Sequence, residues 1–362
     1  MKLKYFMGGI AALASLLPVS AQQTKILTAE KHNEYGLIYT LPVTALDVEV
    51  TAVKETRKAG PYYQYAKKYV GTDKVVKDDA EVWTIKSVKV RPYGIPDPDA
   101  RYLMQLKPGA TTFIGVDENG MLLSINTNPE LPEVEKTEIP PMEGERIGEN
   151  EYLQYVDEDF IASQSSAKQA QMLAENLMEI RDAKISLTRG TADTMPTDGK
   201  QLEIMLNSLA HQEATLTAAF LGNITKETVV RNFTFVPAEN GKKTLFRLSN
   251  FNGFVDAEDY SGEPVYITVD ITNEGTLPVD AKGETKKLPK DAVAYSVPGA
   301  AEITISFGGK TLWQQELEMA QFGVIFGLNP NIFSDKKDPS YAVFDPATGA
   351  LKEIGTVRGE QQ

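Results

Sequence analysis

Apolar and polar residues alternate along much of residues 22–129, which is the pattern of strands with one buried face. The segment 46–51 (LDVEVT) shows the alternation most clearly. Further strand segments are predicted at 82–90, 101–106, 111–116 and 121–125. The last two flank Asn119-Gly120, a pair that is typical of hairpin turns because both residues accept positive φ. Residues 22–129 are therefore predicted to form an N-terminal β-rich unit.

Helical spacing replaces the alternation in residues 160–222. Two apolar stripes recur every three or four residues: Ala170, Leu173, Leu177 and Ile180, then Leu202, Met205, Leu206, Leu209, Leu216 and Phe220. This spacing places each stripe on one face of a helix. Asp198 is a suitable N-cap for the second helix, and Gly222 is a suitable end. We therefore expect an antiparallel helical hairpin.

Residues 223–362 return to the strand pattern, and they are predicted to form a C-terminal β-rich domain. Asn240-Gly241 lies between the apolar segments 229–236 and 244–248 and predicts a second hairpin. Further strands are expected at 265–271 and 302–307. The fold class is then α+β, mainly β, with two β-rich, sandwich-like units and an inserted antiparallel helical hairpin.

Residues 130–159 differ from both neighbours because they carry 11 acidic and only 2 basic side chains. Pro132, Pro140 and Pro141 oppose a helix or a central strand in this range. We interpret the segment as a solvated, extended connector. The alternative is a docking strip for a basic partner or a calcium site, although no spaced Asp loop supports calcium.

Two pairs of segments resemble each other across the chain. Residues 36–42 are similar to 323–329, and residues 116–125 are similar to 344–354. The order is the same in both halves, but the intervening lengths differ, so a true duplication and a chance likeness of hairpins both stay open.

The first 21 residues have the three parts of a secretory signal peptide. Lys2 and Lys4 precede an uncharged, mostly apolar run at 5–17, and small residues follow. Cleavage is expected between Ala21 and Gln22. The apolar run is too short for a membrane span of about 20 residues. The chain has no cysteine to carry a lipid. We therefore expect an exported, soluble protein in the periplasm or outside the cell, with no transmembrane segment and no lipid anchor.

Composition argues against several chemistries. The absence of cysteine excludes disulfides and thiolate sites, and the only histidines are His32 and His211. A formal charge of −13 argues against general nucleic-acid binding. No nucleophile elbow, phosphate loop or zinc motif is present, so no catalytic residue, metal site or cofactor is predicted. His211 lies about 200° from the apolar stripe of its helix and is expected to face solvent.

Two groups of residues are weak binding candidates. Tyr62 and Tyr63 belong to a tyrosine-rich segment that Pro61 is expected to open as a short helix. These rings suit a sugar-stacking or protein-binding face, but a role in the core is equally physical and is favoured. Asp256 and Asp259 form an acidic cluster before a strand, which suits a cation or sugar site or simply an exposed loop.

Several segments resemble an uncharacterised, domain-of-unknown-function family of exported proteins from Bacteroides-type bacteria. They are KAGPYYQYAKKYVG (58–71), TADTMPTDGKQLEIMLNSLAHQEATLTAAFLG (191–222), SGEPVY (261–266) and FDPATGAL (344–351). The resemblance implies export and one architecture along nearly the whole mature chain, and it supplies no catalytic residue. In that setting Asp193-Thr194-Met195 resembles an O-glycosylation acceptor, which implies a glycan on Thr194.

Three functions fit these features. The leading hypothesis is a non-enzymatic binding or scaffold protein at the cell envelope, with a protein or glycan partner that the sequence does not identify. The second is a carboxylate-dependent hydrolase acting on glycans, because 50 acidic residues offer many pairs. The third is an adhesion or fibre subunit, which would require self-association or an unpaired strand groove.

Overall fold

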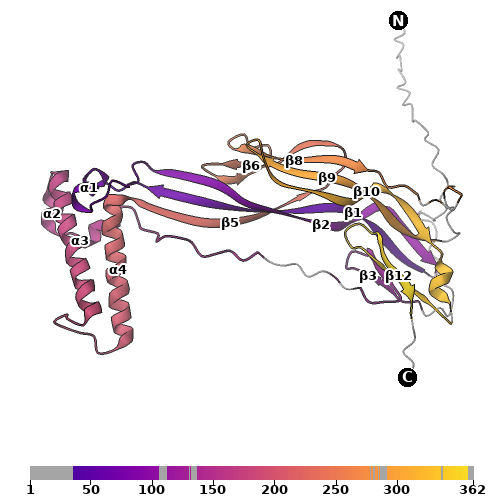
Figure 1. Cartoon of the computed structure of the whole chain (residues 1–362), viewed down its shortest axis with the longest axis horizontal. Coiled ribbons are helices and arrows are strands. Elements are labelled where there is room, and N and C mark those ends of the chain that lie inside the picture. The colour runs from indigo at the N-terminus through magenta and orange to yellow at the C-terminus, as the bar shows by residue number, and fades with distance from the viewer. Residues whose placement is uncertain are drawn as a thin grey trace, which may run out of the picture.

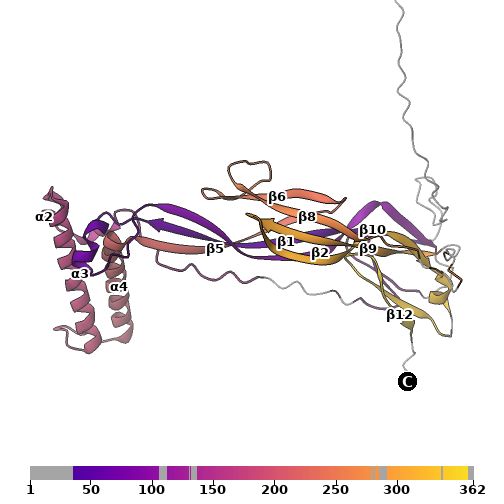
Figure 2. The ribbon, with the colours of Figure 1, turned by 45° about the horizontal axis from the view of Figure 1, so that its top comes forward.

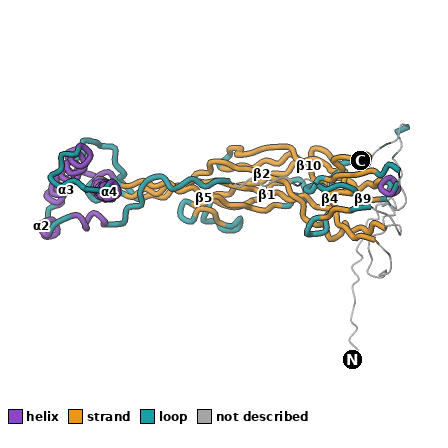
Figure 3. Tube along the Cα trace, turned by 90° about the horizontal axis from the view of Figure 1, so that it is seen from below, coloured by secondary structure: helices purple, strands orange, loops and turns teal. Residues whose placement is uncertain are grey.

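The computed structural model describes residues 36–105, 112–129, 131, 137–277, 279, 282–283, 285, 292–335 and 337–357. The molecule is a rod with a helical head at one end and three sheets along the rest (Figure 1, Figure 3). The predicted class, α+β and mainly β with a helical hairpin, is confirmed. The predicted signal peptide and its Ala21–Gln22 cleavage site lie outside the described residues.

The axis of the rod is a long antiparallel pair, β1 (Gly36–Lys58) and β2 (Ala80–Gln105). A strand of 23 residues spans about 75 Å at about 3.3 Å per residue. The predicted alternation is present: Leu46, Val48 and Val50 are fully buried on one face of β1. At the end of the rod nearest the head, both strands extend beyond the other strands of the rod and lead into the head (Figure 1).

Two facing sheets form the middle of the rod, and together they are called the sandwich below. One has the order β2-β1-β5 and the other β10-β9-β8-β6-β7. The new strands are β5 (Asn223–Phe235), β6 (Gly241–Ser249), β7 (Gly253–Val255), β8 (Glu263–Asn273), β9 (Val293–Phe307) and β10 (Lys310–Leu328). Inward-facing residues of both sheets share one core, in which Phe233 stacks on Phe246 with ring centroids 4.2 Å apart.

The hairpin predicted around Asn240-Gly241 is wrong. β5 pairs with β1, whereas β6 pairs with β7 and β8, so the chain crosses from one sheet to the other between them. Asn240 does not serve a tight turn, because its side-chain oxygen accepts the amide N–H of Ile271 at 2.6 Å. The Gln321 side chain donates to the carbonyl of Pro237 at 2.8 Å and holds the crossing.

A third sheet, of order β12-β11-β4-β3, closes the end opposite the head. Its strands are β3 (Ile114–Val116), β4 (Leu122–Ile125), β11 (Ser340–Phe344) and β12 (Leu351–Thr356), and η3 (Pro330–Ser334) lies beside them. The predicted Asn119-Gly120 hairpin is confirmed as β3–β4. Strands from the ranges 22–129 and 223–362 meet in this sheet and in the β2-β1-β5 sheet, so the described parts of these ranges do not form separate sheets.

The two halves nevertheless repeat one arrangement. In β1 the Thr40 amide donates to the Gly120 carbonyl at 2.9 Å, and in β9 the Ser296 amide donates to the Gly349 carbonyl at 3.0 Å. The flanking sequences are YTLP (39–42) and YSVP (295–298). Segments 116–125 and 344–354 therefore hold equivalent positions beside β1 and β9, which favours the duplication that the sequence left open. The partner of 36–42 is in β9 and not at 323–329, which belongs to β10, the counterpart of β2.

The head contains η1 (Tyr63–Tyr65), α1 (Ala66–Tyr69), η2 (Glu151–Tyr155), α2 (Glu158–Ala162), α3 (Ser166–Arg189) and α4 (Gly199–Leu221). The predicted hairpin is α3–α4, and its two helices run across the long axis of the rod (Figure 2). Asp198 caps α4 by accepting the Lys200 amide at 3.0 Å, and Gly222 ends it, as expected. In the described residues no helix has the length and apolar character needed to cross a membrane.

Candidate functional site at the junction of rod and head

The rod meets the head where β1 ends at Lys58 and β5 begins at Asn223. The chain after β1 passes tightly against the end of α4, since the Tyr62 amide donates to the Ala219 carbonyl at 2.9 Å. Gly60 makes this approach possible: a Cβ there would lie 2.5 Å from the Ala219 carbonyl oxygen. Glycine at a close backbone contact is therefore a structural requirement here.

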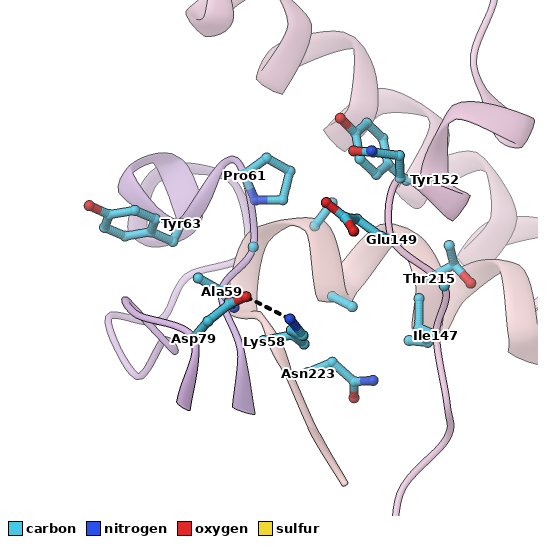
Figure 4. Close-up of a pocket in the computed structure, with 15 residues that line it drawn as sticks. Lys58, Ala59, Pro61, Tyr63, Asp79, Ile147, Glu149, Tyr152, Thr215 and Asn223 are labelled. Carbon is cyan, nitrogen blue, oxygen red and sulfur yellow. Dashed lines mark hydrogen bonds and ion pairs between the residues drawn. The ribbon is translucent and has the colours of Figure 1, made fainter. Parts of the chain in front are cut away.

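A cavity of about 410 Å³ lies at this junction (Figure 4). Three parts of the chain enclose it: the loop after β1 with Asp79, the acidic segment before η2, and the last turns of α4 with Asn223. Its lining residues are Lys58, Ala59, Gly60, Pro61, Tyr63, Asp79, Ile147, Gly148, Glu149, Asn150, Tyr152, Thr215, Ala218, Ala219 and Asn223. The lining thus mixes charged groups with amide, aromatic and small apolar groups.

Lys58 and Asp79 form the charged wall of the cavity. The Lys58 ammonium lies 2.8 Å from Asp79 Oδ2, and Asp79 Oδ1 accepts the Ala59 amide at 2.8 Å. The hydrogen bond from Lys58 lowers the pKa of Asp79, and the backbone amide lowers it further. The same bond raises the pKa of Lys58. Both side chains are exposed, so the ion pair places two opposite charges beside the cavity and contributes little to the free energy of unfolding.

Opposite this pair, the acidic segment supplies Glu149, Asn150 and Tyr152. Asn150 has a φ of 60°, in the left-handed region that asparagine tolerates better than most residues. The chain turns there into η2, which brings the Tyr152 ring edge-on against Tyr62 at 5.9 Å between centroids. In Figure 4 the Glu149 carboxylate lies between Pro61 and Tyr152 at the upper side of the cavity.

Thr215 on α4 is a buried residue that also lines the cavity. Its side chain is almost fully buried, and its hydroxyl has no hydrogen-bond partner among the described residues. A buried hydroxyl without a partner is unusual, because its desolvation is not compensated. Because the hydroxyl oxygen itself is inaccessible, Thr215 lines the cavity with the other atoms of the residue.

His211, one turn before Thr215 on α4, holds the acidic segment in place. Its Nδ1 contacts the Glu145 carboxylate, and its Nε2 lies 2.6 Å from Glu151 Oε1. These two hydrogen bonds raise the pKa of His211. The pKa of Glu151 is lowered, first by the Gly148 amide and then by His211. The expectation that His211 simply faces solvent is therefore wrong: the side chain is about a third exposed and carries two carboxylate contacts.

Residues 137–150 of the acidic segment are extended, as predicted, and they also contact the rod, whereas Glu151–Tyr155 form η2 and α2 begins at Glu158, which the prediction missed. Glu143 and Lys226 of β5 exchange two backbone hydrogen bonds of 2.9 Å, and Thr137 donates to Glu49 of β1 at 2.5 Å. We call residues 137–151 the strap, because they run along the rod towards the head (Figure 1). The strap positions one wall of the cavity.

The candidate residues from the sequence fall in separate places. Tyr63 lines the cavity, whereas Tyr62 is buried beside it in the core of the head and donates to Gln169 at 3.3 Å. Asp256 and Asp259 lie in the loop before β8 on the sandwich. Thr194 is exposed in the α3–α4 loop, where its glycosylation remains a prediction. In the described residues, no cluster of three His, Asp or Glu side chains has metal-binding geometry.

Sequence reasoning did not identify Lys58, Asp79, Glu149 or Thr215. Lys58 ends β1 and the two carboxylates lie between elements, so their mutual approach depends on how the rod enters the head. One signal in the sequence could have indicated the contact between strap and head. A strongly acidic segment needs cationic partners, and His211 is one of only two histidines in the chain.

Comparison with known proteins places the chain in a family without supplying a function. No curated protein and no solved structure matches it. A family model described as a domain of unknown function, DUF4831, matches residues 35–352, which include every described strand and helix apart from the last residues of β12. The chain belongs to the DUF4831 family, a family defined by a domain of unknown function.

Proposed function

We propose that the chain is an exported, non-enzymatic binding or scaffold protein of the cell envelope, and that the junction cavity holds its ligand. The observation that carries this proposal is the position of the cavity. It lies where the rod, the strap and the head meet, so a ligand there contacts all three. Binding in such a place couples occupancy to the orientation of the head on the rod.

The lining indicates the kind of ligand. Asp79 already has Lys58 as its partner, whereas Glu149 and Asn150 stand on the opposite wall. Ile147, Pro61 and Tyr152 supply apolar surface between them. A small molecule with hydroxyl or amino groups on an apolar frame fits this distribution, because its polar groups reach both walls while its frame covers the apolar residues.

Thr215 gives the cavity surface and no hydrogen bond, because it lines the cavity while its hydroxyl oxygen is buried away from it. The His211 contacts with Glu145 and Glu151 hold the strap, which supplies one wall of the cavity. The cavity is therefore preformed, which lowers the entropic cost of binding.

The test is native mass spectrometry of the mature protein purified from its own host. We expect a small molecule that remains bound under gentle ionisation and is lost from the Ala218→Leu protein, because the larger side chain fills the cavity that Ala218 lines. Ala167→Leu, on the exposed surface of α3, is the matched control and should retain it. If the wild type and both variants all have the mass of the protein alone, with no small molecule retained from host extracts, the proposal is not supported.

A second candidate function, a carboxylate-dependent glycan hydrolase, is favoured by one observation: Asp79 and Glu149 line the same cavity. Hydrolysis requires one protonated carboxyl as general acid, whereas Lys58 lowers the pKa of Asp79 and keeps it ionised. Only Glu149 is then available as the acid. Release of reducing sugar from host polysaccharides by the wild type, and its loss in Glu149→Gln, would replace the binding proposal with this one.

A further inference from the structure

Two aromatic side chains are unusually exposed on the sandwich: Phe251 at 86% and Tyr260 at 84%. They lie in neighbouring loops. β6 ends at Ser249 beside the start of β8, since Leu248 pairs with Glu263, and Gly262 lies directly against the Leu248 backbone. Both loops therefore leave the sheet at one corner, and Figure 2 shows the loops beside β6 standing clear of the rod.

The corner is ordered by its own contacts. The Arg247 guanidinium lies 4.4 Å from the centroid of the Tyr260 ring, and it donates to the Ala257 carbonyl at 2.8 Å and the Gly262 carbonyl at 3.2 Å. One face of the Tyr260 ring is thus supported by a fixed cation, while the side chain remains largely open to solvent. Rings held in this way lose little conformational freedom when a ligand covers them.

Ser249 orders the other loop. Its hydroxyl accepts the amides of Phe251 and Asn252, at 3.3 and 3.4 Å. The next residue, Gly253, has a φ of 68° and lies against the Trp83 ring of β2, where a Cβ would come within 2.6 Å. The loop is therefore held on the facing sheet, and Phe251 extends from a supported position.

The surroundings of the rings are polar and acidic. Asn250, Asn252, Asp256 and Asp259 flank them in the two loops. The carboxylates accept hydrogen bonds from hydroxyl groups, and the amides both accept and donate them. The carboxylates also repel anionic partners such as nucleic acid or acidic lipid. A pyranose ring has an apolar face that stacks on an aromatic ring and a rim of hydroxyls.

We infer that this corner, with the rings of Phe251 and Tyr260 as stacking platforms, binds a neutral glycan. The inference is independent of the junction cavity, because the corner lies on the sandwich and shares no lining residue with that cavity. Asp256 and Asp259 then act as hydrogen-bond acceptors for sugar hydroxyls, which refines the cation or sugar site predicted from the sequence.

The experiment is affinity electrophoresis of the mature protein in native gels that contain neutral glucan, mannan, galactan or xylan. Oligosaccharides of any retarding polymer are then titrated by calorimetry. We expect retardation of the wild type and at least about a tenfold higher Kd for each of Phe251→Ala and Tyr260→Ala, since each 1.4 kcal/mol of lost contact is tenfold. Both side chains are exposed, so the variants should keep the wild-type Tm.

Two controls distinguish this corner from the rest of the surface and from the cavity. Phe113→Ala removes an exposed aromatic ring directly before β3, which lies at the end of the rod opposite the head, and should bind as the wild type does. Ala218→Leu, which fills the junction cavity, should also bind the glycan as the wild type does. The glycan proposal and the cavity proposal can therefore fail independently. Absence of retardation in all four polymers, or retardation unchanged in Phe251→Ala/Tyr260→Ala, overturns the inference. Binding of the wild type only to a protein or to neutral lipid vesicles overturns it as well.

Discussion

The hydroxyl of Tyr39 bonds both backbone groups of Ala294. It donates to the Ala294 carbonyl at 3.2 Å and accepts the Ala294 amide at 2.7 Å. The two residues are 255 positions apart, and both are buried. One side chain thus joins β1 to the first residues of β9, its counterpart in the internal repeat.

Tyr39→Phe should lower the free energy of unfolding by about 1–3 kcal/mol, because it leaves the buried amide and carbonyl of Ala294 without partners. Urea unfolding followed by circular dichroism measures this change. Tyr295→Phe is the matched control at the equivalent position of the repeat, since its hydroxyl has no hydrogen bond to the described residues. Equal losses in the two variants would mean that the Tyr39 bonds are not responsible.

The repeat also shows which features of the fold could be predicted from the sequence. Alternation identified the β1 face with Leu46 and Val48, and helical spacing with Asp198 and Gly222 identified α4, because these signals are local. The β5–β6 crossing was missed because an Asn-Gly pair reports on turn conformation and not on which strands pair. YTLP and YSVP were the better repeat signal, since the tyrosines pack in equivalent ring pairs: Tyr39 on Tyr102 and Tyr295 on Phe326.

The candidate site was less predictable than the fold. Sequence reasoning named Tyr62 and Tyr63 together as weak candidates, and only Tyr63 lines the cavity, because its relation to Lys58 and Thr215 depends on segments that meet only in the folded chain. Burial of Thr215 without a partner leaves no trace in sequence, because threonine is ordinary in a helix. Proximity of this kind is set by tertiary packing and not by any local pattern of residues.

The contacts of His211 predict a pH-dependent contribution to stability. The pKa of His211 is raised in the folded protein, so the charged form is favoured by folding. Its contribution is fully present below the unfolded value of about 6.5 and is lost as pH rises through the raised folded value. His211→Gln should therefore be less stable than the wild type at pH 5.5, with a difference that shrinks as the pH is raised.

Urea midpoints measured from pH 5.5 to 9 check this relation. Glu145→Gln, which removes one of the two carboxylates, should reduce the pH dependence without abolishing it, because Glu151 still contacts the ring. A difference between wild type and His211→Gln that is constant over the whole range would assign the effect to packing.

Gly60→Ala should destabilise the junction. The added methyl would lie 2.5 Å from the Ala219 carbonyl and 2.6 Å from the Ala218 carbonyl, both of which are backbone atoms that cannot turn aside. We expect a loss of about 1–3 kcal/mol, as for other overpacked positions. Gly199→Ala is the control: a Cβ added there meets no atom within 4 Å, and alanine favours the helix, so stability should be unchanged or higher.

Export and modification make a separate prediction from the N-terminal sequence and the α3–α4 loop. The mature protein from its own host should begin at Gln22, as measured by N-terminal sequencing. Its intact mass should exceed the sequence mass by a glycan that is absent from Thr194→Ala, since Thr194 is exposed in that loop. Masses of the two proteins that differ only by the substitution itself would exclude a glycan on Thr194.

Thr215 and Thr217 test the packing of α4 beside the junction cavity. Both hydroxyls are buried without a hydrogen-bond partner in the described part of α4, but only Thr215 lines the cavity. Valine has nearly the same shape, so Thr215→Val and Thr217→Val should each leave the unliganded protein as stable as the wild type or raise stability by up to about 1 kcal/mol. At either position the substitution removes a buried hydroxyl that has no partner, so the free energy of unfolding should not fall. Because neither hydroxyl is accessible from the cavity, both variants should retain the small molecule seen in native mass spectra. A loss of stability in either variant would show that its hydroxyl has a partner in solution, and loss of the small molecule from either would show that the packing of α4 has changed.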